Sequence, residues 1–277
     1  MKTTYRIFLT VFIIFATTAA SASTEGLRLY QLNCGHIDFK DLSFFSDTGD
    51  YDGHSGEMVV PCYLIKHPQG WLMWDTGLPE SLIGKPNINI LGAKETVSTT
   101  IESQLKLIGI TVKDIHFVSF SHLHGDHAGN ANLFKDATWI LQKKELAFAT
   151  ATPPPPGINP EQFSLLKSVK KIEIDGDYDV FGDGSVKFLI APGHTPGHQV
   201  LNVNLKKKGP YILAGDLFHL DNSRKHHLVP IFNTSRAETL ASINRIEGLA
   251  KIKKAKVITQ HEPQAEKLFP ALPKYLD

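Results

Sequence analysis

The sequence lacks features that would assign it to several common classes of protein. It has only two cysteines in 277 residues, and neither has the spacing of a metal ligand, so a cysteine-based metal site is excluded. Its 29 basic and 28 acidic side chains leave a formal net charge of +1, which gives no long-range attraction to nucleic acid or to an anionic membrane. It also has no G-x-S-x-G motif and no cysteine in a reactive context. Hydrolysis through a serine or cysteine nucleophile is therefore not indicated.

A hydrophobic run long enough to cross a membrane is also absent. The N-terminal run, residues 7–15, is well short of the roughly 20 residues that a spanning helix needs. Lys2 and Arg6 precede it, and small residues lead to Ala22, which is the pattern of a secretory signal peptide covering residues 1–22. No cysteine follows that point, which argues against a lipoprotein. We expect a periplasmic or secreted protein, not attached to the membrane once the signal is cleaved.

The remaining residues, 23–277, have the composition of one large globular domain. The whole sequence is 42% hydrophobic and 21% charged, which suits a substantial core. Cys34 ends one strand-like segment and Cys62 lies inside another. If these strands pair in an oxidising compartment, the thiols could form a disulfide; two buried free thiols are an equal alternative.

Residues 121–130 (SHLHGDHAGN) concentrate metal-binding side chains directly after an apolar, strand-like run at residues 115–120. Imidazole and carboxylate groups bind borderline divalent metals such as zinc. His122 and His124 would point the same way from an extended segment, whereas Asp126 and His127 begin the next element and face a second point. Two ligand pairs this close together favour two metals over a polar loop with solvated histidines.

Three later apolar runs end in a further candidate ligand. Residues 191–198 (APGHTPGH) contain His194 in a loop made rigid by glycine and proline, residues 211–216 (YILAGD) end at Asp216, and residues 257–261 (VITQH) end at His261. The ends of buried strands are the expected location of sites in layered α/β proteins. Together the candidates make a complete dinuclear set, which comprises His122, His124, Asp126, His127, His194, Asp216 and His261.

The order of apolar runs and turn residues predicts two mixed sheets sandwiched between helices, built as two αβ/βα halves. We expect helices near residues 97–108, from residue 126, from residue 143 and over residues 236–250, where Leu240, Ile243, Ile246 and Leu249 share one face. The expected strands cover residues 27–33, 59–66, 71–75, 115–120, 138–142, 171–174, 178–181, 186–191, 199–205, 211–215 and 256–260.

Three segments read as loops that could shape a pocket: residues 47–57, residues 78–95, and the proline-rich connector at residues 153–157. The apolar residues of the second loop, together with Phe44, Phe45 and Met58, could face a bound substrate or could be ordinary packing. These alternatives stay open at this point.

These motifs resemble the metallo-β-lactamase superfamily along nearly the whole chain. The matching pieces are WDTG at residues 74–77, HLHGDH at 122–127, PGHTPGH at 192–198, AGD at 214–216 and the late His261. The resemblance implies a four-layer αβ/βα sandwich. It also implies that His122, His124 and His194 hold one metal, that Asp126, His127 and His261 hold the other, and that Asp216 bridges them.

The resemblance further implies supporting roles around the ligands. Asp75 is expected to accept an imidazole N–H and fix the orientation of a ligand, although an ordinary turn aspartate is the alternative. His198 is likewise expected to support the ligands rather than to bind metal. Asp126 is expected to pass a proton to the leaving oxygen as well as to bind metal.

Two divalent cations, two aspartates and a shared hydroxide would leave a charge of about +1, and such a centre lowers the pKa of bound water towards roughly 7. A bridging hydroxide could then open esters, lactones, thioesters or amides. Zinc is the expected metal, while manganese, iron and cobalt accept the same ligands.

Within the superfamily, the N-terminal segments, HLHGDHAGN and AGD resemble the N-acyl homoserine lactonases, which open the lactone ring of quorum-sensing signals. Asp216 argues against the zinc β-lactamases, which lack a bridging carboxylate there. Many of these lactonases place a tyrosine three residues after the bridging aspartate, where this chain has His219. His219 could donate a hydrogen bond to the substrate carbonyl, or it could be a plain loop histidine.

We therefore expect a dinuclear hydrolase whose substrate is a small lactone or ester. The main alternatives are a thioesterase of the glyoxalase II kind or another ester or β-lactam hydrolase. A one-iron persulfide dioxygenase is a weaker alternative, and a non-catalytic binding module is the weakest. The sequence leaves acyl chain length and oligomeric state open.

Overall fold

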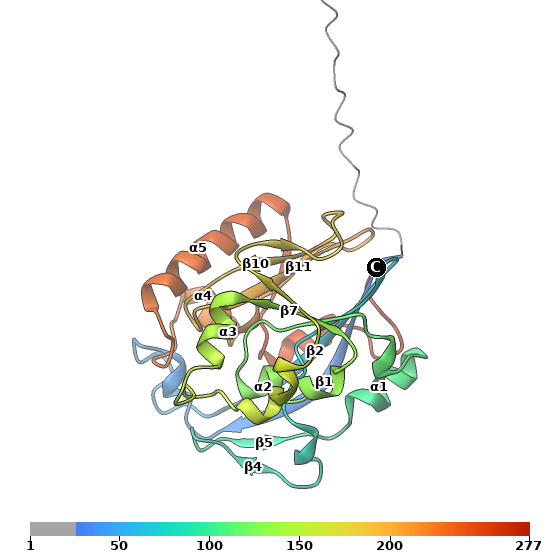
Figure 1. The fold of residues 1–277 in the computed structure, drawn as a ribbon. Coiled ribbons are helices and arrows are strands. Elements are labelled where there is room, and N and C mark those ends of the chain that lie inside the picture. The colour runs from blue at the N-terminus through green and yellow to red at the C-terminus, as the bar shows by residue number, and fades with distance from the viewer. Residues whose placement is uncertain (1–25) are drawn as a thin grey trace, which may run out of the picture.

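Two β-sheets packed face to face form the centre of the molecule, and helices lie on their outer sides (Figure 1). The computed structural model describes residues 26–277. Residues 1–22, which the sequence assigns to a signal peptide, lie outside the described residues. Within residues 26–277 no helix has both the length and the apolar character needed to cross a membrane.

The larger sheet has eight strands and is mixed. Strands β1 to β3 pair antiparallel, whereas β3, β6, β7 and β8 pair parallel, so the ends of β3 and β6 meet at the same edge. In spatial order the strands are β4 (Asn87–Ile88), β5 (Lys94–Thr96), β1 (Arg28–Phe39), β2 (Gly56–His67), β3 (Gly70–Trp74), β6 (Phe117–Ser119), β7 (Thr138–Gln142) and β8 (Lys171–Ile174).

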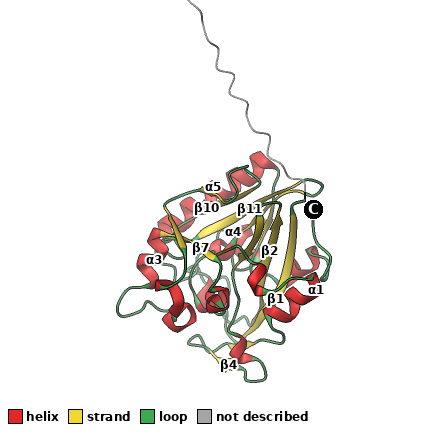
Figure 2. Ribbon diagram, turned by 45° about the vertical axis from the view of Figure 1, so that its right-hand side comes forward, coloured by secondary structure: helices red, strands yellow, loops and turns green. Residues whose placement is uncertain are grey.

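The smaller sheet has five strands and is also mixed. Its only parallel pair is β12 with β13, and the other neighbours are antiparallel. Its spatial order is β13 (Lys256–Ile258), β12 (Gly209–Leu213), β11 (Gln199–Leu205), β10 (Val186–Ile190) and β9 (Tyr178–Asp179). Figure 2 shows the strands of both sheets between the outer helices.

Three apolar layers separate the four structural layers. Between the sheets, Trp74 and Ile140 of the larger sheet pack with Phe188 and Leu201 of the smaller one. A second cluster joins the larger sheet to its helices, and a third joins the smaller sheet to α5, whose Ile243 is fully buried. The four-layer αβ/βα sandwich expected from the sequence is confirmed, because both faces of each sheet are covered.

The helices are short except for α5. The α-helices are α1 (Ile101–Ile108), α2 (Gly125–Ala128), α3 (Lys143–Ala149), α4 (Asp221–His226) and α5 (Arg236–Lys253). Short 3-10 segments cover Ser43–Phe45, Glu80–Leu82, Val112–Asp114, Ala131–Phe134, Pro160–Lys167, Gly215–Leu217 and Pro263–Leu268.

The structure differs from the predicted elements in several places: for example, β1 extends to Phe39 instead of ending near residue 33, and α4 was not predicted. The first helix begins at Ile101 rather than near residue 97, because the Thr100 side chain caps it by accepting the N–H of Ser103. The segment predicted as a loop at residues 78–95 contains β4 and leads into β5, which extend the larger sheet. The strand predicted over residues 211–215 ends at Leu213 and is followed by a 3-10 turn that carries Asp216.

Cys34 and Cys62 form a disulfide between β1 and β2, with their Cα atoms 5.8 Å apart. The two strands are neighbours in the sheet, as the strand pairing considered from the sequence requires. Of the two alternatives left open by the sequence, the structure has the disulfide.

Candidate metal centre

The predicted ligands come together at one edge of the two sheets. Each lies directly after a strand or in the short helix that follows one, so the strand ends bring together residues that are far apart in sequence. His122 and His124 follow β6, Asp126 and His127 lie in α2, His194 follows β10, Asp216 follows β12, and His261 follows β13.

His122, His124 and His194 form a group that we call the three-histidine half. Nε2 of His194 lies 3.1 Å from Nε2 of His122 and 3.1 Å from Nδ1 of His124. Nitrogens bound about 2.0–2.1 Å from a tetrahedral ion are separated by roughly 3.3–3.4 Å, so these atoms converge on one point at nearly the right spacing. Burial lowers the pKa of His124 to about 4 and that of His122 and His194 well below 6.5, which keeps all three rings in the neutral form that binds metal.

Asp126, His127 and His261 form a second group, the acidic half. Oδ2 of Asp126 lies 3.6 Å from Nε2 of His127 and 3.8 Å from Nε2 of His261. Burial alone would lower the pKa of His127, but the carboxylates of Asp216, Asp126 and Asp75 raise it well above 6.5. The pKa of His261 is raised by Asp216 in the same way against the effect of burial. This half therefore has an excess of negative charge that attracts a positive one.

Asp216 lies between the two halves. Its Oδ2 is 3.3 Å from Nε2 of His194 and its Oδ1 is 3.2 Å from Nε2 of His127, so one oxygen faces each half. Burial acts to raise the pKa of this carboxyl, but the surrounding histidines, His127 first among them, hold it well below its usual value. A buried carboxylate with one oxygen directed at each of two histidine groups is suited to bridge two cations.

The polar atoms of the centre fit divalent cations rather than a network of hydrogen bonds. Among residues 26–277, Nε2 of His127 has no hydrogen-bond partner although it is buried and faces the carboxylates of Asp126 and Asp216. A single ring nitrogen of His194 also approaches two other imidazoles, and one proton cannot satisfy both contacts. With nitrogen and carboxylate donors and excess negative charge in one half, the residues fit two divalent metal ions.

Backbone and side-chain acceptors fix the orientation of the ligand rings. Nδ1 of His261 donates to the carbonyl of Val59, at 2.8 Å, and Nδ1 of His194 donates to Oδ1 of Asn233, at 2.9 Å. Each bond leaves Nε2 free to face the centre. Sequence reasoning did not find Asn233, because a lone asparagine in a loop about forty residues from His194 carries no local pattern.

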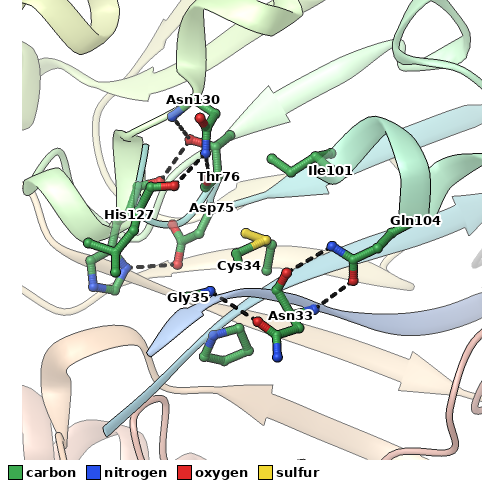
Figure 3. The surroundings of a disulfide bond; sticks show 12 residues. Asn33, Cys34, Gly35, Asp75, Thr76, Ile101, Gln104, His127 and Asn130 are labelled. Carbon is green, nitrogen blue, oxygen red and sulfur yellow. Dashed lines mark hydrogen bonds and ion pairs between the residues drawn. A yellow bond between two sulfur atoms is a disulfide. The ribbon is translucent and has the colours of Figure 1, made fainter. Parts of the chain in front are cut away.

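Asp75 lies beside the ring of His127, at the turn after β3 (Figure 3). Its Oδ2 accepts from Nδ1 of His127 at 3.0 Å, and its Oδ1 accepts the backbone N–H of Ser121 at 2.7 Å. Asp75 has a left-handed backbone (φ 57°), and a Cβ added to Gly77 in the same turn would lie 2.2 Å from Cβ of Cys34. The turn that carries Asp75 thus packs directly on the disulfide.

His198 supports the backbone of the bridging aspartate. Its Nδ1 donates to the carbonyl of Ala191 at 3.0 Å, which leaves Nε2 to accept the backbone N–H of Asp216 at 2.9 Å. Burial lowers the pKa of His198 to about 4, so it is the neutral ring that makes this pair of bonds. The ring holds the main chain of Asp216 and lies beside the ligands.

A cavity of about 770 Å³ opens above the centre, and His124, Asp126, Asp216 and His261 form part of its wall. The rest of the wall is mainly apolar. It includes Phe45, Met58, Leu82, Ile88, Leu91, Phe148 and Phe232, whereas Phe44 is not among the lining residues. His219 also lines the cavity, with Nε2 3.0 Å from Oδ2 of Asp216 and its ring packed near Phe45 and Phe232.

Comparison with known proteins gives relatives along most of the chain. An N-acyl homoserine lactonase, AttM of Azorhizobium caulinodans, is 30% identical over 270 residues, which cover 91% of this chain and 99% of that protein. A lactonase called AiiA from Bacillus thuringiensis subsp. kurstaki is 29% identical over 230 residues, or 79% of this chain and 87% of that protein. A solved N-acyl homoserine lactone hydrolase, described with the product N-hexanoyl-L-homoserine at its catalytic metal centre, superposes with a TM-score of 0.78 at 27% identity and covers 90% of this chain and 98% of its own.

The model of the metallo-β-lactamase superfamily matches residues 55–261, a range that begins in the loop before β2 and ends at His261. It includes the turn of Asp75 and both halves of the centre. With the four-layer fold and the convergent ligand set, this match shows that the chain belongs to the metallo-β-lactamase superfamily.

Proposed function

We propose that the protein is a dinuclear metal-dependent lactonase that hydrolyses N-acyl homoserine lactones. The observation that carries this proposal is the position of the two ligand groups at the bottom of an otherwise apolar cavity. An N-acyl homoserine lactone has a small polar ring joined to an apolar acyl chain, so its two parts match the two parts of the cavity. The AttM and AiiA relatives named above, which are lactonases of this kind, support the same substrate class.

The apolar part of the cavity comes from segments that the larger sheet and the following loops place around the centre. Leu82, Ile88 and Leu91 come from the segment between β3 and α1, and Phe148 comes from α3 on another side. Ile88 is 63% exposed, so this wall is open to solvent at its rim. A chain of several methylenes could therefore enter along the wall while the ring reaches the metal ligands.

Two bound cations would supply Lewis acidity and a water of lowered pKa at neutral pH. The side chains of this protein then orient the substrate and move the proton. Asp126 is the ligand carboxylate nearest to solvent, with 23% of its side chain exposed, and it lines the cavity. We assign to Asp126 the transfer of a proton to the alkoxide oxygen that leaves when the ring opens.

His219 provides a hydrogen-bond donor on the cavity wall, beside the bridging aspartate. Its Nε2 lies beside Oδ2 of Asp216, and its ring is held between Phe45 and Phe232. A lactone carbonyl that approached Asp216 from the cavity would meet this ring. We assign to His219 the orientation of that carbonyl and of the oxyanion that forms from it.

The test is a pH-monitored ring-opening assay with metal-loaded protein and a series of acyl homoserine lactones of increasing chain length. A cephalosporin and an acylated glutathione serve as competing substrates. We expect ring opening with at least one lactone and a kcat/KM well above that for the thioester. Rapid cleavage of the thioester or the cephalosporin with every lactone left intact would refute the lactonase proposal.

We further propose that zinc is the native metal and that the protein is exported. The ligand set of imidazoles and carboxylates supports zinc, and elemental analysis of protein purified without added metal tests it, with about two zinc ions per chain expected. The pattern of residues 1–22 and the Cys34–Cys62 disulfide support an oxidising compartment. Cell fractionation and the N-terminal sequence of the mature protein test export, and an uncleaved cytosolic product would contradict it.

A further inference from the structure

Glu145 is a buried carboxylate that takes no part in the centre as described above. It lies in the first turn of α3, is 3% exposed and does not line the cavity. An ionised side chain is seldom buried unless several donors satisfy it. The donors that satisfy Glu145 come from both of the loops that carry the three-histidine half.

The first oxygen of Glu145 contacts the loop after β6. Oε1 accepts the backbone N–H of Leu123 at 2.9 Å. Leu123 stands between His122 and His124, so this bond fixes the main chain that separates two ligands of the three-histidine half.

The second oxygen contacts the loop after β10. Oε2 accepts from Oγ1 of Thr195 at 2.6 Å and from the backbone N–H of Gly197 at 3.1 Å. Thr195 directly follows His194, the third ligand of this half. Burial raises the pKa of Glu145, while these hydrogen bonds act to lower it, and each partner can donate to the charged form.

Close packing keeps Glu145 against the second loop. A Cβ added at Gly197 would lie 2.2 Å from the backbone nitrogen of Glu145, so only glycine allows α3 to approach this closely. The carboxylate therefore connects two rigid segments, with one oxygen bonded to each. Its position sets the distance between them.

We propose that Glu145 is a positioning residue that sets the spacing of His122, His124 and His194 and so the metal affinity of the three-histidine half. It acts through the backbone of the two loops and touches neither ligand side chains nor substrate. Asp75 is its counterpart in the acidic half, where it contacts His127 directly. This inference rests on the metal centre and is independent of which ester or lactone the protein hydrolyses.

The test measures zinc affinity in two backgrounds, each of which leaves one half intact. His261→Ala disables the acidic half and His124→Ala disables the three-histidine half. Glu145→Gln is then added to each, and metal-free protein is titrated with zinc against a chromophoric chelator. The glutamine keeps the shape of the side chain, but its NH₂ group faces an N–H donor in place of an acceptor oxygen.

We expect Glu145→Gln to weaken zinc binding by about 10- to 100-fold in the His261→Ala background, the usual effect of removing a partner that orients ligands. In the His124→Ala background we expect less than about a threefold change, because the hydrogen bonds of Glu145 go to Leu123, Thr195 and Gly197 and none goes to α2 or to the residues after β13, which carry the acidic half. Equal weakening in both backgrounds, or no weakening in the first, would overturn the proposal.

Two further variants keep the test decisive if Glu145→Gln folds poorly. Thr195→Val removes the hydroxyl that donates to Glu145 and keeps the side-chain shape, whereas Thr195→Ser keeps the hydroxyl. In the His261→Ala background, the valine variant should bind zinc more weakly than the protein with Thr195, and the serine variant should bind zinc about as tightly as that protein. The same zinc affinity for both variants would contradict the proposal. Glu247→Gln is the matched control. Glu247 lies on α5 and pairs with Arg224 of α4, so this change should leave the zinc affinity of both backgrounds unchanged.

Discussion

The two halves of the centre attract metal by different means. The three-histidine half has only neutral rings, because burial lowers the pKa of His124 to about 4 and that of its neighbours also falls. The acidic half has histidines whose pKa is raised by nearby carboxylates. One half therefore depends on the accurate placement of uncharged nitrogens, and the other depends on charge.

The supporting contacts differ in the same way. Asp75 gives the acidic half a charged acceptor directly on the ring of His127, with donors from Ser121 holding the carboxylate in place. The three-histidine half has a neutral amide, Asn233, on the ring of His194. A charged carboxylate thus contacts a ligand ring in the acidic half, which depends on charge. In the three-histidine half, which depends on geometry, a neutral amide orients a ligand ring without adding charge.

Replacing the bridge should have the largest effect, because Asp216 belongs to both halves. Asp216→Asn leaves a single neutral carbonyl oxygen where two charged oxygens faced the two groups. We expect kcat/KM to fall by at least about a thousandfold and the metal content to fall below two per chain. Kinetics and elemental analysis on the same preparation check this, and a variant that keeps two tightly bound ions would show that the halves are independent.

Asp75→Asn should act mainly on the acidic half, because Asp75 contacts His127 directly and reaches His122 only through Ser121. The amide cannot accept from both His127 and Ser121 as the carboxylate does, so the orientation of His127 is loosened. We expect zinc binding to weaken about 10- to 100-fold in the His124→Ala background and to change little in the His261→Ala background. Competition titrations give both values, and the reverse pattern would exchange the roles that we give to Asp75 and Glu145.

The two halves should also respond differently to acid. In the metal-free protein His127 has a raised pKa and holds a proton at neutral pH, so binding a cation must displace it. Affinity in the His124→Ala background should therefore fall as the pH is lowered through the neutral range, by up to about tenfold per pH unit for one displaced proton. In the His261→Ala background affinity should stay nearly flat over the same range, because His124, with a pKa of about 4, is already deprotonated. Equal slopes in the two titrations would remove the distinction.

A change in the cavity wall should leave both halves unaffected and should have the smallest effect. Leu82→Ala removes apolar surface beside the space that we assign to the acyl chain. We expect KM for long-chain lactones to rise by up to about tenfold, with kcat, short-chain substrates and metal content little changed. A kinetic series over chain length checks this, and an equal loss for short and long chains would place the acyl group elsewhere.

Much of the centre could be predicted from the sequence because its ligands follow a local rule. Each stands after an apolar run or in the short helix that follows one, and His122 to His127 lie within six positions, so pattern and chemistry point to the same residues. Even so, the sequence could not decide between a loop histidine and a donor at His219, or between a disulfide and free thiols at Cys34. Those choices depend on which segments the fold places side by side.

The residues that support the ligands were harder to predict from the sequence, because their partners also depend on which segments the fold places side by side. Glu145 lies in the first turn of a short helix and looks like an ordinary helix residue, and its partners lie about twenty and fifty positions away. The short strands β4 and β5 fall almost wholly in a segment predicted as loop, because β5 is formed by pairing with β1 and β4 by pairing with β5, and neither has a strong apolar pattern of its own. Local propensity is weak evidence where a distant partner decides the structure.

The location of the ligands at the seam between the sheets has a consequence for how the protein matures. His122 follows a strand of the larger sheet, whereas His194, Asp216 and His261 follow strands of the smaller one, so ions bound here fasten the two sheets together. Because His261 follows β13, the last strand of the smaller sheet in chain order, a growing chain cannot assemble the full cage until the strands of both sheets have been synthesised. Metal uptake is therefore a late step, completed in whichever compartment folding ends, and it adds stability to the finished sandwich in proportion to RT ln(1 + [M]/Kd).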